Sequence, residues 1–105
     1  MFYINGISWK IKFTYPWDNV FKLKNGQYTI GMCDNNTKTI YLAQNLEGSL
    51  LKKVLCHEIV HAAMFSYGIY LSLDQEEVIA DIIATYGDEI IQITDKVFKK
   101  LQQYI

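Results

Sequence analysis

Cysteine and proline are scarce in this chain of 105 residues, which has two cysteines and one proline. Cys33 and Cys56 cannot make a disulfide framework, so a reducing cytoplasm is the simplest compartment to expect. Residues 1–13 lack the continuous apolar run and the small-residue cleavage site of a signal peptide. The longest uncharged stretch, residues 62–73, is too short to span a bilayer. We therefore expect a cytoplasmic protein with no membrane segment.

An excess of charge of one sign is also missing. The formal net charge is −1, and the ten basic residues are dispersed along the chain. This balance gives no electrostatic reason to expect nucleic acid or an anionic membrane as a partner. Half of the residues are hydrophobic, which is ample for a packed core and argues against disorder. The length indicates a single domain over residues 1–105.

The N-terminal part of the chain has the patterns of β-strands. Residues 2–4 and 7–14 predict a hairpin around a type I′ turn at Asn5-Gly6, and the apolar residues of its second strand alternate from Ile7 to Phe13. Two more strands are expected at residues 28–33 and 38–43, joined by a turn-rich segment.

Residues 17–27 allow two interpretations. Asp18 could cap a short helix over residues 20–23. Alternatively, Phe21 and Leu23 could pair across Asn25-Gly26 with Tyr28 and Ile30. The sequence does not decide between them.

The C-terminal part has helical periodicity. A helix is expected over residues 47–67, with Gly68 as its stop, and a second over residues 73–86 that begins with a capping box. Gly87 either kinks that helix or separates it from a final helix over residues 88–104. The final segment has an apolar stripe that we expect to pack against the domain: Ile90, Ile91, Val97, Phe98, Leu101 and Ile105.

Strands followed by helices indicate an α+β domain with a small antiparallel or mixed sheet of three or four strands. The chemistry of the chain centres on the first helix, where His57-Glu58-x-x-His61 contains both histidines of the protein. Residues four apart lie on one helical face, so the two imidazoles can reach one metal ion. Zinc suits such ligands, and Glu58 is then placed to take a proton from a metal-bound water. The motif therefore predicts a zinc-dependent peptidase core.

A catalytic zinc needs a third protein ligand, which must be a carboxylate or a thiolate because no third histidine exists. Glu77 and Asp81 in the second helix are again four residues apart; one can bind the metal while the other orients a ligand histidine. Glu76 is the rival third ligand, since a small change of helical register would exchange it with Glu77. We discount Cys33 and Cys56 as ligands.

These spacings resemble a known family. His57-Glu58-x-x-His61 followed by Glu77-x-x-x-Asp81 is similar to the gluzincin pattern of zinc metallopeptidases. The closest resemblance is to the ImmA/IrrE-type group and its short phage and prophage members, over roughly residues 28–90. It rests on three further segments: Glu77-x-x-Ala80-x-x-Ile83-Ala84, Gly31-Met32-Cys33-Asp34 and Thr39-Ile40-Tyr41.

The resemblance implies a minimal zincin-like domain in which His57, His61 and Glu77 bind zinc, Asp81 supports His57 and Glu58 is the general base. It also implies a protein or peptide substrate, such as a repressor-like regulator of a phage or mobile element. By analogy with zincin folds, the strand containing Thr39, Ile40 and Tyr41 is expected to form the cleft edge that pairs with an extended substrate.

Two questions stay open at this level. Peptide hydrolysis needs an electrophile besides zinc, and Tyr67, Tyr70 and Tyr86 are candidates, although a structural role is favoured for each. The other question is the function class. The alternatives to a peptidase are a zincin-fold interaction or structural protein with little turnover, and a zinc hydrolase of a non-peptide amide.

Overall fold

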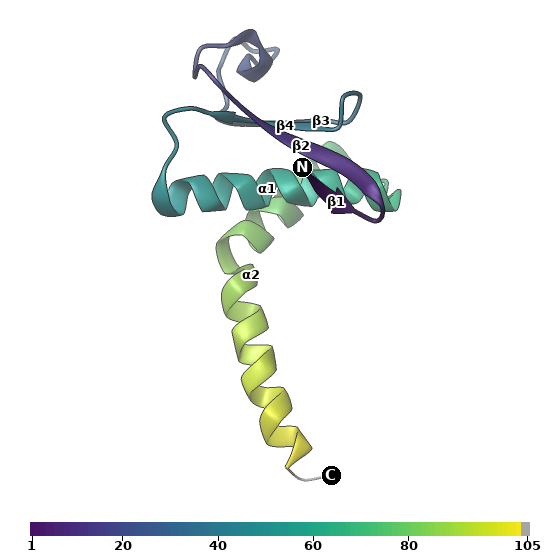
Figure 1. Cartoon of the computed structure of the whole chain (residues 1–105). Coiled ribbons are helices and arrows are strands. Elements are labelled where there is room, and N and C mark those ends of the chain that lie inside the picture. The colour runs from purple at the N-terminus through teal and green to yellow at the C-terminus, as the bar shows by residue number, and fades with distance from the viewer. Residues whose placement is uncertain (104–105) are drawn as a thin grey trace.

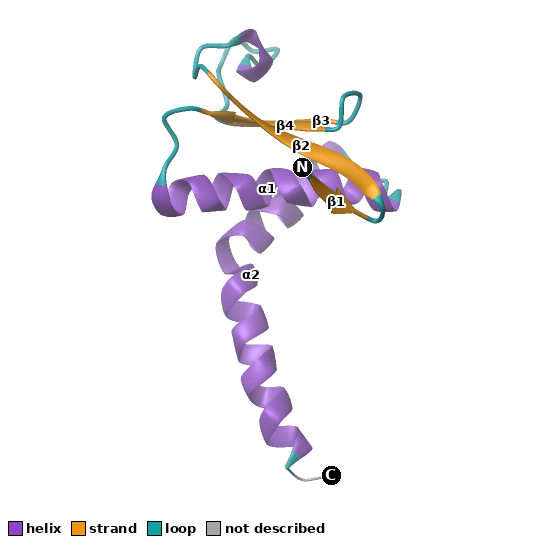
Figure 2. Cartoon of the chain, viewed as in Figure 1, coloured by secondary structure: helices purple, strands orange, loops and turns teal. Residues whose placement is uncertain are grey.

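The computed structural model of the chain describes residues 1–103 and has a small sheet followed by two long helices (Figure 1, Figure 2). The expected α+β class is confirmed. In chain order the elements are β1 (Phe2–Ile4), β2 (Ile7–Thr14), the 3-10 helix η1 (Asn19–Phe21), β3 (Gly31–Asp34), β4 (Thr39–Ala43), α1 (Gly48–Tyr67) and α2 (Leu73–Gln102).

The four strands form one mixed sheet in the order β1-β2-β4-β3. β2 and β4 are parallel, whereas β1 pairs with β2 and β3 pairs with β4 in antiparallel fashion. The predicted hairpin between β1 and β2 is confirmed, because Asn5 and Gly6 have φ angles of 49° and 76°, both positive as a type I′ turn requires. β4 therefore lies inside the sheet, and β3 forms one of its two edges.

The main core lies between the sheet and α1, which runs along one face of the sheet (Figure 1). Trp9 of β2 is buried there, and its indole Nε1–H donates a hydrogen bond of 2.8 Å to Ser66 Oγ on α1. Asn5 Nδ2 donates to the backbone oxygen of the same serine at 3.0 Å. The alternation expected along β2 does not reach its end, since Phe13 is half exposed. The hairpin thus anchors the end of α1 and fixes this helix against the sheet.

Each interpretation of residues 17–27 is partly right. Asp18 does cap a short helix, accepting a hydrogen bond of 2.9 Å from the Val20 N–H, but the helix is the 3-10 turn η1 and starts at Asn19. The chain then folds back, although the bridge joins Lys22 to Tyr28 and lies one residue out of the expected register. The tight 3-10 turn places Phe21 in the core, and regular pairing of β3 starts only at Gly31.

The ends of the helices agree with the sequence signals. α1 ends at Gly68, whose φ of 65° and ψ of 37° are left-handed, as expected of a glycine C-cap. α2 begins with the predicted capping box, in which Ser72 and Gln75 exchange hydrogen bonds of 3.2 Å. No helix within residues 1–103 is long and apolar enough to cross a membrane.

The expected separation at Gly87 is wrong, because α2 continues unbroken through this residue to Gln102. A glycine inside a helix costs about 1 kcal/mol relative to alanine, whereas ending a helix there would leave several backbone groups without partners. The packing expected for the apolar stripe is also wrong: the second half of α2 projects away from the domain (Figure 1), and Phe98 is 56% exposed. Ile105 lies outside the described residues.

An alanine substitution at Gly87 tests the continuous helix. Gly87→Ala is expected to raise the free energy of unfolding by up to about 1 kcal/mol, because a helical backbone favours alanine. An added Cβ meets only the Ile83 side chain, with Cγ2 at 3.3 Å and Cβ at 4.0 Å. Urea denaturation followed by circular dichroism measures the change.

The same substitution at Gly68 is the matched control. Gly68→Ala meets no atom within 4 Å but keeps a left-handed φ, so it should destabilise by about 1 kcal/mol. A loss of helicity in Gly87→Ala would contradict the continuous helix.

Candidate metal centre

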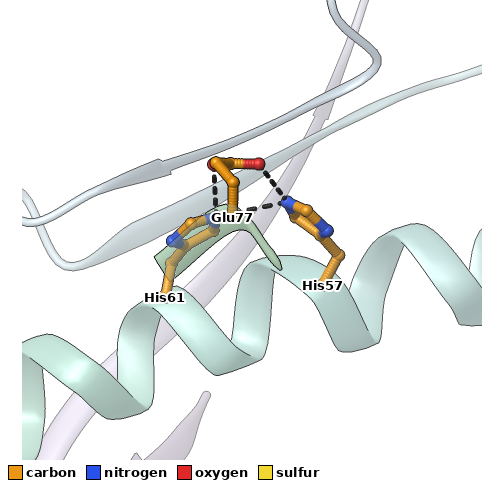
Figure 3. A group of neighbouring side chains, drawn as sticks. All are labelled: His57, His61 and Glu77. Carbon is orange, nitrogen blue, oxygen red and sulfur yellow. Dashed lines mark hydrogen bonds and ion pairs between the residues drawn. The ribbon is translucent and has the colours of Figure 1, made fainter. Parts of the chain in front are cut away.

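His57 and His61 project from one face of α1 toward the first turns of α2 (Figure 3). Their separation by about one helical turn brings the rings side by side, with the two Nε2 atoms 3.2 Å apart. Each Nε2 also meets the Glu77 carboxylate of α2: His57 Nε2 lies 3.0 Å from Oε2, and His61 Nε2 lies 2.8 Å from Oε1. The His-Glu-x-x-His spacing therefore directs both imidazoles at one point, as predicted from the positions of residues four apart on a helix.

The three side chains form a group that can hold a metal ion, since their ligand atoms all lie within 4.8 Å of one another. Ligands at about 2.0–2.1 Å from a tetrahedral zinc ion are separated by about 3.3 Å. The two Nε2 atoms are 3.2 Å apart, and each lies near that distance from one of the two Glu77 oxygens, at 3.0 Å for His57 and 2.8 Å for His61. The geometry thus suits a small cation held by three protein ligands, and it does not by itself select one metal.

Two further carboxylates lie on the outer side of the rings. Asp81 Oδ1 is 2.9 Å from His57 Nδ1, and Glu76 Oε1 is 2.6 Å from His61 Nδ1. In the tautomer that has its proton on Nδ1, an imidazole donates to this outer carboxylate and would direct the lone pair of Nε2 at the Glu77 carboxylate. Three acceptor groups then face one another, an arrangement that a cation between them would stabilise.

Glu76, the alternative third ligand, lies outside the metal group. Its carboxylate contacts Nδ1 of His61, the ring nitrogen that faces away from the metal position. Its side chain is only 12% exposed, whereas that of Glu77 is 46% exposed. The two consecutive glutamates are separated by about 100° around the helix, so one reaches Nε2 atoms and the other an Nδ1 atom. This second role of Glu76 was not among the expectations from the sequence. The pair Glu76-Glu77 could have suggested it, because each of two ligand histidines needs an outer partner.

Glu58 is buried in α1 and lines the same cavity as both histidines. Burial raises the pKa of this carboxyl group and the nearby Glu77 raises it further, whereas His61 and His57 oppose the shift. β3 approaches closely here: a Cβ on Gly31 would lie 3.1 Å from Glu58 Cγ and 2.8 Å from Val54 Cγ1. Only glycine lets the strand pass this near to the carboxylate.

The cavity over the metal group has a volume of about 560 Å³. Its charged side holds the two histidines with Glu58, Glu76 and Glu77, and its other side is apolar. The apolar wall comes from Leu23, Met32, Phe65, Leu71 and Leu73. Such a space can accept a chain segment with an apolar side chain beside the metal position.

The expectation that Thr39, Ile40 and Tyr41 form the cleft edge is wrong. They belong to β4, whose backbone is paired with β2 on one side and with β3 on the other. The open edge is that of β3, and Gly31, Met32 and Cys33 of this strand line the cavity. The sequence carried a signal for this, since β4 has apolar residues on both faces, as is typical of a central strand.

The candidate electrophiles do not reach the cavity. Tyr67, Tyr70 and Tyr86 are 59%, 92% and 55% exposed, and none of them lines it. Within residues 1–103 the lining contains no tyrosine, lysine or further histidine. In the part described, the chain therefore positions no second electrophile over the metal group.

Neither cysteine belongs to the metal group found among the described residues. Cys33 lines the cavity from β3, whereas Cys56 lies in a groove between α1 and α2. Burial raises the pKa of the Cys33 thiol to about 12, and the negative charges of Glu58 and Glu76 add to this shift. At neutral pH the thiol is therefore protonated and is a poor metal ligand.

Metal binding distinguishes the two glutamates. Purified protein should take up one equivalent of zinc, and Glu77→Ala and His57→Ala should abolish stoichiometric binding because each removes a ligand. Glu76→Ala should weaken affinity by about 10–100-fold, the usual effect of losing an outer partner. Competition with a chromophoric chelator measures these affinities. Glu47→Ala, at an exposed position without a side-chain cap bond, is the control. Greater loss in Glu76→Ala than in Glu77→Ala would contradict the assignment.

The reactivity of Cys33 tests its environment. In a Cys56→Ser variant without metal, iodoacetamide at pH 8 should alkylate Cys33 at least about 100-fold more slowly in the folded than in the urea-unfolded protein. The sign follows from the raised pKa: the folded thiol stays protonated at pH 8, while an unfolded thiol is partly ionised. Mass spectrometry of timed samples gives both rates. Equal rates would show that Cys33 is exposed as a thiolate.

No protein-family model matches this chain, and searches of curated proteins and of solved structures gave no match either. Inference about its function therefore depends on the side chains around the cavity and on the sequence motifs that place them.

Proposed function

We propose that this protein is a zinc-dependent metallopeptidase. One observation carries the proposal: two histidine Nε2 atoms and the Glu77 carboxylate converge on one point, and the buried Glu58 lines the same cavity. Metal group and general base thus share a space that can also hold a substrate segment. The resemblance of the sequence motifs to the gluzincin pattern, and most closely to the ImmA/IrrE-type group, supports the same reaction class.

Zinc is the preferred ion for this set of ligands. Two neutral imidazoles and one carboxylate leave one tetrahedral position free, the arrangement of catalytic rather than structural zinc sites. Calcium and magnesium favour sites made of oxygen ligands and would make poor use of the imidazoles. Bound zinc would polarise the scissile carbonyl and lower the pKa of the attacking water.

Glu58 has the central role among the protein's own groups. Its carboxylate accepts the proton of the attacking water and returns it to the leaving amine. Burial, which raises its pKa, favours the uptake of that proton. Asp81 and Glu76 hold the imidazole rings through their Nδ1 atoms, so that both Nε2 atoms stay directed at the cavity.

The open edge of β3 suits an extended peptide. A peptide added as a strand beside β3 would pass over the metal group, with its backbone hydrogen-bonded to the edge. One of its side chains would then face the apolar wall formed in part by Phe65, Leu71 and Leu73. A protein substrate such as a repressor-like regulator of a phage or mobile element is part of the proposal, and it rests on the resemblance alone.

A metal-binding protein with little turnover is the second candidate. It is favoured by the cavity lining, which within the described residues offers no tyrosine, lysine or third histidine to stabilise an oxyanion.

Glu58→Gln decides between the two candidates. The variant keeps the shape of the side chain but cannot accept the proton. Zinc stoichiometry should be retained, and cleavage of a fluorogenic peptide library should fall by at least about 100-fold. Glu47→Gln, an exposed change of the same kind, should leave cleavage unaltered. If zinc-loaded wild type cleaves no faster than Glu58→Gln, the peptidase proposal fails and binding with little turnover is favoured.

A further inference from the structure

The second half of α2, residues 86–102, is here called the projecting segment. It extends away from the sheet and α1 and has no contact with them at its far end (Figure 1). Its large apolar side chains are about half exposed, at 49–61%. They include Tyr86, Ile90, Ile91, Val97, Phe98 and Leu101.

These side chains form one continuous face. At 100° per residue they fall within an arc of about 140°, while Gln92 and Lys99 lie on the opposite side. The steps of three and four residues from Tyr86 to Ile90, Ile93 and Val97 are those of helices that pack side by side. The face is therefore shaped to receive another helix along its whole length.

The exposed apolar area is larger than a monomer usually leaves uncovered. Six side chains, each about half exposed, present roughly 600 Å², the upper limit of the largest patch on a typical monomer. Two such faces would bury roughly 1,200 Å² together, the lower end of stable protein interfaces. The exposed area and the helical spacing of the face together indicate a helical occupant.

The distribution of charges along the projecting segment indicates which kind of partner covers its apolar face. Three acidic residues, Asp88, Glu89 and Asp95, are followed by three basic ones, Lys96, Lys99 and Lys100. A parallel pair of such helices would place like charges level with one another, whereas an antiparallel pair would place acidic level with basic. A helix that lies on an anionic membrane is rich in basic residues, whereas this segment has as many acidic as basic residues.

We propose that the projecting segment pairs in antiparallel fashion with the same segment of a second copy of this chain. A two-fold axis at Thr94 brings Glu89 to within one residue of the level of Lys100 of the second copy, at the same edge of the apolar face. Because each chain supplies both residues, this pair occurs twice.

A groove between α1 and α2 extends the interface. It has a volume of about 590 Å³ and contains Cys56 of α1 together with Ile83, Gly87 and Ile91 of α2. In this register Leu101 of the second copy lies level with Gly87, where the missing side chain leaves room. The groove and the metal cavity share no lining residue. The pairing therefore goes beyond the proposed function and does not depend on it.

Sedimentation of the whole protein tests the pairing. Wild type should be a dimer at micromolar concentration, and Ile90→Glu or Phe98→Glu should weaken self-association by at least 100-fold. Gln92→Glu adds the same charge on the opposite face and should leave the dimer intact. Circular dichroism and zinc stoichiometry should not change in any variant, because the affected residues are exposed. A monomeric wild type, or a dimer that survives Ile90→Glu, overturns the proposal.

Charge reversal tests the orientation. Lys100→Glu should weaken an antiparallel dimer by about tenfold, and adding Glu89→Lys should restore it. A parallel dimer would respond to neither change, and that result overturns the antiparallel arrangement. Vesicles with 30% phosphatidylserine complete the test: a monomer that binds them would assign the apolar face to a lipid surface and overturn the proposal.

Discussion

The contact between α1 and the first turns of α2 is the constraint on which the rest of the site depends. His57 and His61 come from one helix and Glu77 from the other, and their ligand atoms all lie within 4.8 Å of one another. Asp81 and Glu76, also from α2, contact the outer nitrogen of each ring and so orient both imidazoles.

The sheet contributes to the site in two ways: it fixes the position of α1, and its strand β3 forms one side of the cavity. The buried Trp9 and its hydrogen bond to Ser66 fix α1 against the strands, and Gly31 lets β3 pass close to Glu58. The metal group, the buried carboxylate and the open edge of β3 then surround one cavity. The second half of α2 takes no part in this arrangement, which is why its apolar face is free to serve as an interface.

Local signals in the sequence were reliable wherever one short segment determines its own conformation. The Asn5-Gly6 turn, the capping box at Ser72 and the glycine end of α1 all appear where expected, since each depends on a few neighbouring backbone groups. The same is true of the two histidines, because helical geometry alone places residues four apart on one face. The prediction of a helix end at Gly87 was wrong, because the low helix propensity of glycine costs less free energy than ending the helix there.

By itself, then, the sequence determined the α+β class, the two histidines and the pair of glutamates that could complete the metal group. Tertiary structure decided which glutamate faces the Nε2 atoms and which stands behind a ring, since a rotation of α2 by one residue would exchange them. It also decided that β4 is central and β3 is the edge, because the parallel pairing of β2 with β4 joins strands far apart in the chain. Such long-range pairing leaves little trace in local patterns, as it depends on how distant segments share one core.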